Sequence, residues 1–468
     1  MPDPSPLRLS LVEAGELIRR RALSPVELTE AVLARIEALD ARLNAFTTLV
    51  PSDQVLAAAR AAEDEIARGG WRGPLHGIPV GVKDLIDTAG LRTTYGSGMF
   101  RDHVPARDGA VPARLRAAGA VITGKTATHE FGKGITTNNH FFGPTRNPWN
   151  LEHVPGGSSG GAAAAVAALM GPLQIGTDGG GSIRFPAAFC GVTGLKPTLG
   201  LISNRGQFGG GDSSFSVPGP LTRSVRDAAL AAQALAGFDP DYLYSRPGPG
   251  PDLVGGLEAG VRGLRVGVSE DFLTAELQPG VRAAYEATLR RLEGLGTRVV
   301  EVRMPHHHLV FRGITACFGI EGNLALEELL GDRPRVFGPE VQIINDMTPT
   351  PDVAACVRTQ QDRQRVRRDY EAAFVEADVL VLPVAPMPAP RIDQDGLHAA
   401  GACMPYTGAA NLVGLPSVPL PAGRCDGLPV AVQIMAPVGA DALALRVAYT
   451  LEQAASEHRV QVPPIAAA

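Results

Sequence analysis

The sequence predicts an α/β protein in which a central, twisted, mixed β-sheet is flanked by helices on both faces. Short β-branched runs such as IPVGVKD and AVITGKT, from Trp71 onward, alternate with helical stretches, as in doubly wound α/β proteins. A similar alternation returns after residue 263. The composition, 45% hydrophobic and 19% charged over 468 residues, allows a large buried core.

The first two elements are expected to be helices. Residues 10–39 and 52–68 carry apolar side chains at spacings of three and four, with Ser, Asp or Pro near their starts. This pattern is typical of amphipathic helices. We therefore expect an N-terminal helical layer over residues 1–70, packed on the sheet.

The remaining chain is expected to build one sheet. After a core at residues 71–235, a surface excursion rich in Pro, Gly and Asp is followed by LRVGVSEDF, a helix and TRVVEV, which predict a further β-α-β unit. ADVLVLPVAP and LPVAVQIMAP predict late strands. No internal repeat is present, so residues 1–468 are predicted to form one domain, with 236–468 continuing the sheet and adding variable pocket elements.

Charge and cysteine usage limit the partners. The net charge is −5, and the basic stretch 363–368 falls in a helical pattern, which favours a solvated helix face over nucleic-acid binding. Five widely spaced cysteines without a C-x-x-C pair indicate reduced thiols. The N-terminus lacks the apolar core of a signal peptide, and we find no apolar run of membrane-spanning length. We expect a cytoplasmic protein that binds neither nucleic acid nor membrane.

The glycine-rich stretch GGSSGGAAAAVAALMGPLQIGTDGGGSIRFP, residues 156–186, is the candidate site. Glycine weakens regular structure, so its clusters indicate sharp turns or close backbone approach. A helix over 162–170, ended by Pro172, and a returning strand over 173–177 would bring Ser182 close to Ser158. The backbone N–H groups of TDGGGS, residues 177–182, are suited to an oxyanion hole. An ordinary turn between strand and helix is the alternative.

A serine nucleophile needs a base. The histidines are scattered, and the three at 306–308 follow a proline, where a solvated turn is favoured over a metal site. Lys83 ends a strand in which Ile78, Val80 and Val82 alternate with small or constrained residues, so its ammonium can enter the interior. It serves as a base only if burial or a positive dipole lowers its pKa. A solvated strand end is the alternative.

Three motifs in order resemble those of the amidase signature family of serine hydrolases. They are GVKDLIDTAGLRTTYGS, PGGSSGGAAAAVAAL and GTDGGGSIRFPAAFCGVTGLKPT, and the likeness extends over residues 10–455. The resemblance implies the amidase signature fold, with Lys83 as the base, Ser158 as a relaying serine after a cis Gly157–Ser158 peptide bond, and Ser182 as the nucleophile of an acyl-enzyme.

The resemblance also assigns the supporting groups. It implies an oxyanion hole from the backbone N–H groups of Gly179, Gly180, Gly181 and Ser182, and a mechanism without metal or cofactor. Gly179 departs from the family, which usually has Thr, Ile or a similar side chain there, so a looser turn is expected. Four further residues of the motifs are treated as supporting: Ser159 by hydrogen bonding, Arg184 by tying down the loop, and Thr177 and Asp178 beside them.

Two motif matches offer rival interpretations. GAVITGKT, residues 119–126, matches the phosphate-binding loop of nucleotide-hydrolysing enzymes, but its apolar residues 120–123 favour a strand. GGSSG, residues 156–160, matches the nucleophile elbow of α/β-hydrolases, with Ser158 as nucleophile, but NPWNLEHVP precedes it instead of a buried strand.

The resemblance favours a free-standing amidase that cleaves small or aryl amides, with esters and carbamates as further substrates. The alternative is the catalytic subunit of a glutamine-dependent amidotransferase that acts on misacylated transfer RNA within a complex. A homo-oligomer is left open. We expect residues 95–107, 207–215 and 311–347 to build the pocket, with Gly209–Gly211 leaving it open and mobile.

Overall fold

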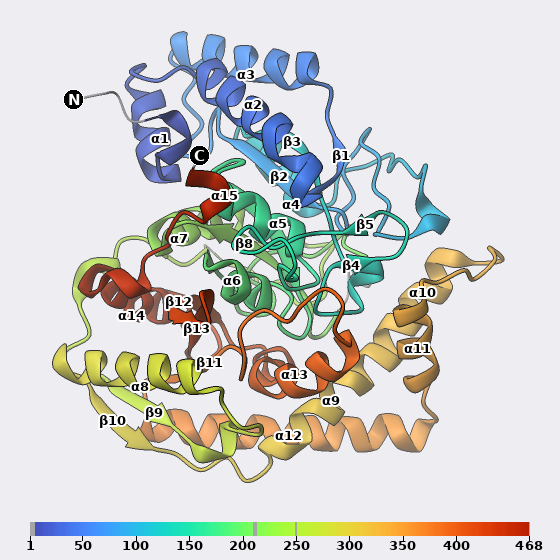
Figure 1. Ribbon diagram of the computed structural model, residues 1–468, viewed down its shortest axis with the longest axis vertical. Coiled ribbons are helices and arrows are strands. Elements are labelled where there is room, and N and C mark those ends of the chain that lie inside the picture. The colour runs from blue at the N-terminus through green and yellow to red at the C-terminus, as the bar shows by residue number, and fades with distance from the viewer. Residues whose placement is uncertain (1–4, 209–212, 249, 468) are drawn as a thin grey trace.

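Two β-sheets form the centre of the protein (Figure 1). The computed structural model describes residues 5–208, 213–248 and 250–467. The first sheet has six strands in the order β1-β3-β2-β6-β8-β7, and the second has five in the order β10-β9-β11-β13-β12. The first comprises β1 Phe46–Leu49, β3 Val121–Thr126, β2 Pro79–Lys83, β6 Leu173–Asp178, β8 Val217–Thr222 and β7 Thr193–Gly194. The second comprises β10 Arg298–Glu301, β9 Arg265–Val268, β11 Val379–Pro383, β13 Leu428–Met435 and β12 Ser417–Cys425.

The two sheets meet edge to edge. Lys196, just after β7, and Ser417, at the start of β12, exchange backbone hydrogen bonds of 2.9 and 2.8 Å. Strand β2 runs parallel to both of its neighbours, whereas β8 and β13 run antiparallel to theirs. The predicted mixed strand directions are confirmed, but the expectation of one sheet that continues to the C-terminus is wrong, because the strands form two sheets that meet at this junction.

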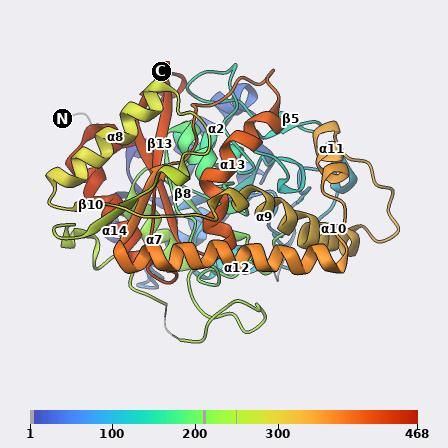
Figure 2. The ribbon, with the colours of Figure 1, turned by 90° about the horizontal axis from the view of Figure 1, so that it is seen from below.

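Helices cover both faces, as predicted (Figures 1 and 2). On β11, Val379 and Val381 enter the core that contains α7 and α14, while Leu380 and Leu382 enter the core beside α9, α12 and α13. Side chains alternate between the faces of a strand, so a continuous apolar run is buried on both sides. The helices are α1 Leu11–Arg19, α2 Pro25–Leu43, α3 Ser52–Ala67, α4 Ala110–Ala117, α5 Gly160–Ala167, α6 Arg184–Cys190, α7 Val225–Leu235, α8 Pro279–Gly294, α9 Val310–Cys317, α10 Asn323–Leu330, α11 Pro339–Met347, α12 Val353–Glu376, α13 Gly396–Val413, α14 Asp441–Ala454 and α15 Pro464–Ala467.

The predicted helix over residues 10–39 is two helices. Ser10 and Glu13 form a capping box at the start of α1. The side chain of Ser24 accepts hydrogen bonds from the backbone N–H groups of Val26 and Glu27, and Pro25 occupies the first position of α2. Proline is compatible with the first turn of a helix and unfavourable in its interior, so the chain breaks here.

The expectation that no apolar run reaches membrane-spanning length is wrong for one helical stretch. The helical run His307–Leu330, which includes α9 and α10, is long and apolar enough to cross a membrane by length and composition alone. In the protein 44% of its apolar stretch is buried, and α9 lies beside α12 (Figure 2). Core helices of other proteins share this length and composition, so the observation is weak evidence for a membrane.

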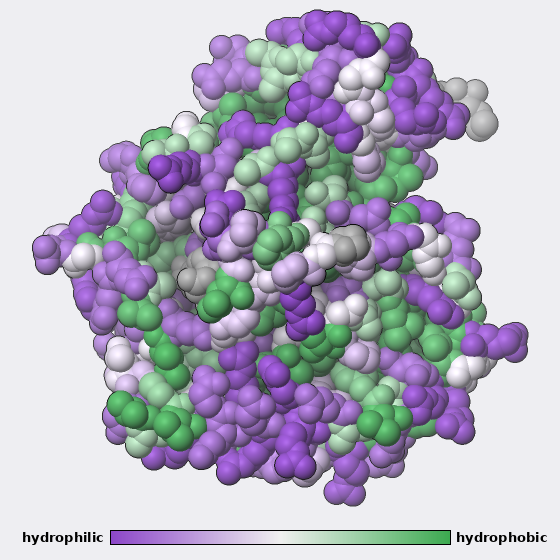
Figure 3. All heavy atoms as spheres, turned by 180° about the vertical axis from the view of Figure 1, so that it is seen from behind, coloured by the Kyte–Doolittle hydropathy of each residue, from purple (hydrophilic) through white to green (hydrophobic). Residues whose placement is uncertain are grey.

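The surface is mixed in character. On the face opposite to that of Figure 1, hydrophilic and hydrophobic residues are interspersed (Figure 3). The division of the single domain at residues 70 and 235 remains our proposal for how the chain is organised.

Candidate active site

Lys83 is the last residue of β2, and its side chain is fully buried. Val80 and Val82 point into the core that contains α7, so strand alternation directs Lys83 to the opposite face. Its ammonium nitrogen lies 2.7 Å from Ser158 Oγ, 2.7 Å from Ser159 Oγ and 3.0 Å from Thr177 Oγ1. The alternative of a solvated strand end is therefore wrong.

Burial controls the charge of this lysine. Desolvation lowers the pKa of Lys83 well below its ordinary value, while the carboxylate of Asp178 acts in the opposite direction. The three groups nearest to the nitrogen are neutral hydroxyls, which do not compensate for a buried positive charge as a carboxylate in contact would. The surroundings favour the uncharged amine.

Ser158 and Ser159 lie in the turn that leads into α5, and both are buried. The Gly157–Ser158 peptide bond is cis, as the resemblance implied. Ser159 Oγ donates to the carbonyl of Thr177 at 3.0 Å and accepts from the Thr177 N–H at 3.2 Å, besides its contact with Lys83. These bonds tie the turn to the end of β6.

Three glycines separate Ser182 from the end of β6, and Ser182 is 8% exposed. The N–H of Ser159 donates to the carbonyl of Ser182 at 3.2 Å, so the helix and the returning strand bring the two segments into contact, as predicted. Helix α5 ends at Ala167, earlier than predicted. Ser158 and Ser182 line the same cavity, although their hydroxyls form no hydrogen bond with each other within the described residues.

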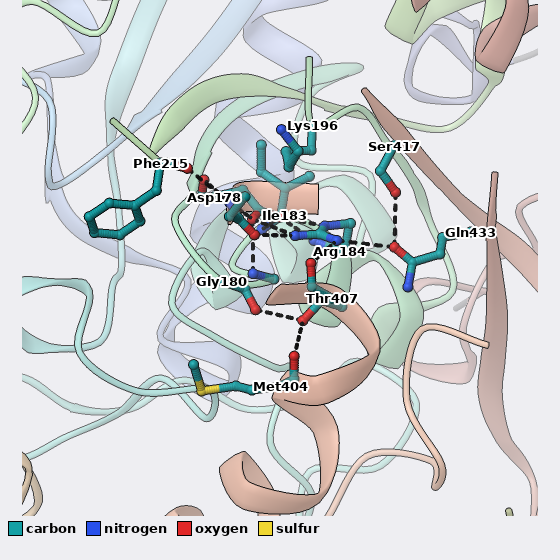
Figure 4. A network of polar contacts seen from close by, with 12 residues as sticks. Asp178, Gly180, Ile183, Arg184, Lys196, Phe215, Met404, Thr407, Ser417 and Gln433 are labelled. Carbon is teal, nitrogen blue, oxygen red and sulfur yellow. Dashed lines mark hydrogen bonds and ion pairs between the residues drawn. The ribbon is translucent and has the colours of Figure 1, made fainter. Parts of the chain in front are cut away.

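A buried ion pair holds the turn before Ser182 (Figure 4). Arg184 Nε and Nη2 donate to the two carboxylate oxygens of Asp178 at 3.0 and 2.9 Å, and both side chains are fully buried. Arg184 also donates to Gln433 on β13 and to Thr407 and Asn411 on α13. Although burial opposes it, contact with Arg184 holds the pKa of the Asp178 carboxyl below its usual range. The geometry agrees with the expectation that Arg184 ties down this loop.

The glycine turn has fewer free donors than predicted. The Gly181 N–H donates to Asp178 Oδ1 at 2.8 Å, which corrects its assignment to the oxyanion hole. The N–H groups of Gly179, Gly180 and Ser182 have no such acceptor in the described part of the chain. Three of the four predicted donors are therefore available.

The departure at Gly179 has a physical reason. A Cβ atom there would lie 3.2 Å from the ring of Phe215 and 3.2 Å from the ring of Phe318. These two rings pack edge to face with centroids 4.9 Å apart. The aromatic pair occupies the space that a larger residue would need.

Two cavities adjoin Ser182. The smaller, of about 40 Å³, reaches Ser158 and Thr177. The larger, of about 140 Å³, is predominantly apolar. Both share Gly132, Lys133 and Phe318. The apolar side chains of the larger cavity are Ile135, Phe185, Phe311, Phe318, Ile344, Met347, Leu397, Ala400 and Met404.

The pocket expectations are confirmed in part. Segments 207–215 and 311–347 supply lining residues. Among the residues that the structure describes, none from 95–107 lines either cavity. The expectation for Gly209–Gly211 lies outside the described residues. Sequence reasoning missed Lys133, Thr407 and Asn411. The last two are polar and four residues apart on a largely apolar helix, and that spacing was a usable signal.

The two rival interpretations do not fit the structure. Lys125 and Thr126 of GAVITGKT are buried in β3, where Lys125 donates to Thr88 Oγ1 at 2.8 Å and to the carbonyl of Ile86. This lysine cannot face a phosphate. The turn at GGSSG follows a loop and not a strand, which an elbow requires.

Fold and site together define an α/β protein of the hydrolase type. A family model described as Amidase matches residues 27–445. The chain belongs to the amidase signature family.

Named relatives are similar over nearly the whole chain. A glutamyl-tRNA(Gln) amidotransferase subunit from Roseiflexus castenholzii is 40% identical, with 92% of each chain covered. The same subunit from Moorella thermoacetica is 38% identical, with 96% of this chain and 97% of that protein covered.

Solved structures extend the comparison. One, described as a vestigial complex that reveals the origins of an s-triazine catabolic enzyme, has a TM-score of 0.89 at 34% identity and covers 97% of this chain and all 100% of that one. A bacterial aryl acylamidase has a TM-score of 0.87 at 30% identity, with 96% of each chain covered. A peptide amidase from Stenotrophomonas maltophilia has a TM-score of 0.87 at 32% identity, with 98% of this chain and 99% of that one covered.

These relatives correct one expectation from the sequence. The net charge and the short basic stretch led us to exclude nucleic acid as a partner. The amidotransferase subunits, which are 38–40% identical to this chain, are named after a reaction on glutamyl-tRNA(Gln). The net charge of a single chain therefore does not exclude nucleic acid as a partner, because other subunits of a complex can bind the nucleic acid.

Proposed function

We propose that this protein hydrolyses carbon–nitrogen bonds of small amides through an acyl-enzyme on Ser182. Neutral Lys83 accepts the proton of Ser158, Ser158 accepts that of Ser182, and Ser182 Oγ attacks the carbonyl carbon. When the tetrahedral intermediate collapses, the same chain of groups returns the proton to the leaving amine. Water then adds to the acyl-enzyme while Lys83, through Ser158, takes up its proton. As the bond between the acyl carbon and Ser182 Oγ breaks, this proton returns to Ser182 Oγ and the carboxylic acid is released.

The contacts around Lys83 support this direction of proton flow. An uncharged amine has two N–H groups and one lone pair, so one of the three neighbouring hydroxyls has to donate to it. The proton of Ser159 already points to the carbonyl of Thr177. Ser158, which shares a cavity with Ser182, is the donor we assign.

The oxyanion is assigned to the free N–H groups of Gly179, Gly180 and Ser182. Backbone donors fixed before the reaction stabilise the charge that develops on the carbonyl oxygen without reorganising during the step. The Asp178–Arg184 pair fixes the turn that carries them.

The observation that carries the proposal is the apolar cavity of about 140 Å³ at Ser182. Its phenylalanine, leucine, isoleucine and methionine side chains favour an aryl or aliphatic substituent next to the scissile bond. An ester or carbamate of the same shape passes through the same acyl-enzyme. A cytoplasmic location and the absence of a cofactor remain part of this proposal.

A hydrolysis screen tests the proposal. Aryl anilides, aliphatic amides, esters, carbamates and L-glutamine would be compared with the purified wild type and with Ser182→Ala. We expect release of product from at least the anilides and esters and its loss in the variant. Turnover that survives in Ser182→Ala, or no turnover of any of these compounds, would contradict the proposal.

A second candidate is the catalytic subunit of a glutamyl-tRNA(Gln) amidotransferase. The curated relatives favour this function over the free-standing amidase, because subunits of that name match at 38–40% identity over nearly their full length. The same serine would then release ammonia from glutamine. The apolar side chains of the cavity favour the first candidate, since they suit an aryl or aliphatic substituent that free glutamine lacks.

Purification from the native cell separates the two candidates. The second requires companion subunits that co-purify stoichiometrically and transfer of the glutamine amide nitrogen to glutamyl-tRNA(Gln). A monodisperse chain without companions that hydrolyses anilides faster than glutamine supports the first.

A further inference from the structure

Lys133 is a cation in the wall of both cavities at Ser182. The residue is only 4% exposed, and its neighbours in the larger cavity are mainly apolar. It follows Gly132, where a Cβ atom would lie 3.4 Å from Ser158 Oγ. The buried side chain of Lys133 therefore belongs to the wall of the cavities that Ser182 lines, and the proton relay does not use it.

The ammonium group of Lys133 has only neutral partners. It donates to Asn323 Oδ1 at 3.1 Å and to Asn345 Oδ1 at 2.6 Å. Among the described residues, no carboxylate lies within ion-pair distance of it. A buried charge without a counter-ion is unfavourable, so an anion supplied from outside would be bound with a gain in free energy.

Two donors remain unused at this position. An ammonium group has three N–H donors, and the asparagine oxygens take two of them. The amide nitrogen of Asn345, on the same side-chain group that contacts Lys133, is a buried donor without a hydrogen-bond partner in the described structure. A carboxylate has two oxygens and matches this pair of donors.

We propose that Lys133 is a specificity-determining residue that binds an anionic group of the substrate. The preferred substrates are then amides that carry a carboxylate or a similar anion within reach of the scissile bond, with their apolar part in the larger cavity. This inference rests on the proposed amide hydrolysis and names its substrate class. Burial lowers the pKa of Lys133 to about 8, so the group is still mostly charged at neutral pH.

Matched substrate pairs test the proposal on the wild-type protein. Because Lys133 borders both cavities, one set carries the carboxylate on the acyl side, as in succinyl, glutaryl and adipyl p-nitroanilides. A second set carries it on the leaving group, as in anilides of 4-aminobenzoate. Each compound is compared with the neutral primary amide of the same shape. We expect kcat/KM of the anionic member to be higher by about tenfold to a hundredfold in at least one set.

Variants then assign the preference to this residue. Lys133→Met should reduce the ratio of kcat/KM between anionic and neutral members by at least about tenfold, mainly through KM, and Lys133→Arg should retain most of it. Arg312→Met is the matched control, since Arg312 already pairs with Asp362, and it should leave the ratio unchanged.

The outcomes separate the two levels of the proposal. Equal turnover of anionic and neutral members in both sets would overturn the role of Lys133 while the amidase proposal holds. A preference that persists in Lys133→Met would overturn it as well. No turnover of any member would contradict amide hydrolysis itself.

Discussion

The side-chain nitrogen of Lys83 lies 2.7 Å from Oγ of Ser158, at the end of a buried strand, and no carboxylate in the described part of the chain contacts it. In this position the amine can accept a proton only because burial disfavours its charged form.

Replacing Lys83 with Met should lower kcat by about 100- to 10,000-fold, because the general base is lost while the apolar stem is kept. Steady-state hydrolysis of an anilide measures the effect, and thermal unfolding verifies the fold. Lys125→Met is the matched control, since Lys125 is an equally buried lysine on the adjacent strand that contacts Thr88 and not the serines. A loss of less than about tenfold in Lys83→Met would mean that another base operates.

The pH profile should reveal the same amine. Lys83 is active only when neutral, so kcat/KM for an uncharged substrate should be constant at high pH and fall as the pH drops through the pKa of Lys83 in the folded protein. Since burial lowers that pKa well below 10.5, the fall should lie well below the range of an ordinary lysine. A fall of kcat/KM that begins near pH 10.5, the ordinary pKa of a lysine, would contradict a buried neutral base.

A fluorophosphonate probe should label Ser182. The probe forms a covalent bond with an activated serine, and peptide mass spectrometry locates the adduct. Ser182→Ala should abolish labelling, whereas Ser203→Ala, which alters a buried serine that bonds to Asp239, should not. An adduct on Ser158 would favour the rival elbow interpretation.

Breaking the Asp178–Arg184 pair should destabilise the protein strongly. Arg184→Met leaves a buried carboxylate without its partner, which typically costs about 3–5 kcal/mol of unfolding free energy. Chemical denaturation measures this difference. Arg265→Met is the control, because the pair of Arg265 and Asp378 is partly exposed, with side chains 33% and 29% accessible, so that water screens the attraction and the loss of stability should be much smaller. Similar losses in both variants would show that burial of the pair is unimportant.

Enlarging Gly179 should strain the aromatic pair beside it. Gly179→Thr brings a side chain against Phe215 and Phe318, and overpacking of this kind typically costs about 1–3 kcal/mol. Thermal unfolding and kcat/KM should both decline. Phe318→Leu in the same chain should restore part of the loss, and a strictly additive double variant would show that the ring is not the obstacle.

Much of the fold followed from local patterns. Short apolar and β-branched runs predicted the strands that became β2, β9 and β11, and their alternation with helical stretches predicted the α/β fold. The boundary between α1 and α2 was missed, although Ser24 and Pro25 signalled it, because the apolar spacing continued across the break. The position of the glycine turn was predicted correctly, but Gly181 was wrongly counted among its free N–H donors. The hydrogen bond from Gly181 to Asp178 depends on the three-dimensional path of the turn.

By itself the sequence determined the class of fold, the order of the three motifs and the identity of the lysine and serines. The class of fold and the candidate residues follow from side-chain alternation and turn chemistry, which act between neighbours in the chain, whereas the roles of Lys83, Ser158 and Ser182 are what the resemblance of the motifs implies. Only the tertiary structure decided that Lys83 is sealed from water, that Arg184 meets Thr407 and Gln433 from distant elements, and that Lys133 lies beside an apolar cavity with neutral partners only among the described residues. Desolvation and long-range contacts set those properties, and neither exists until the chain is folded.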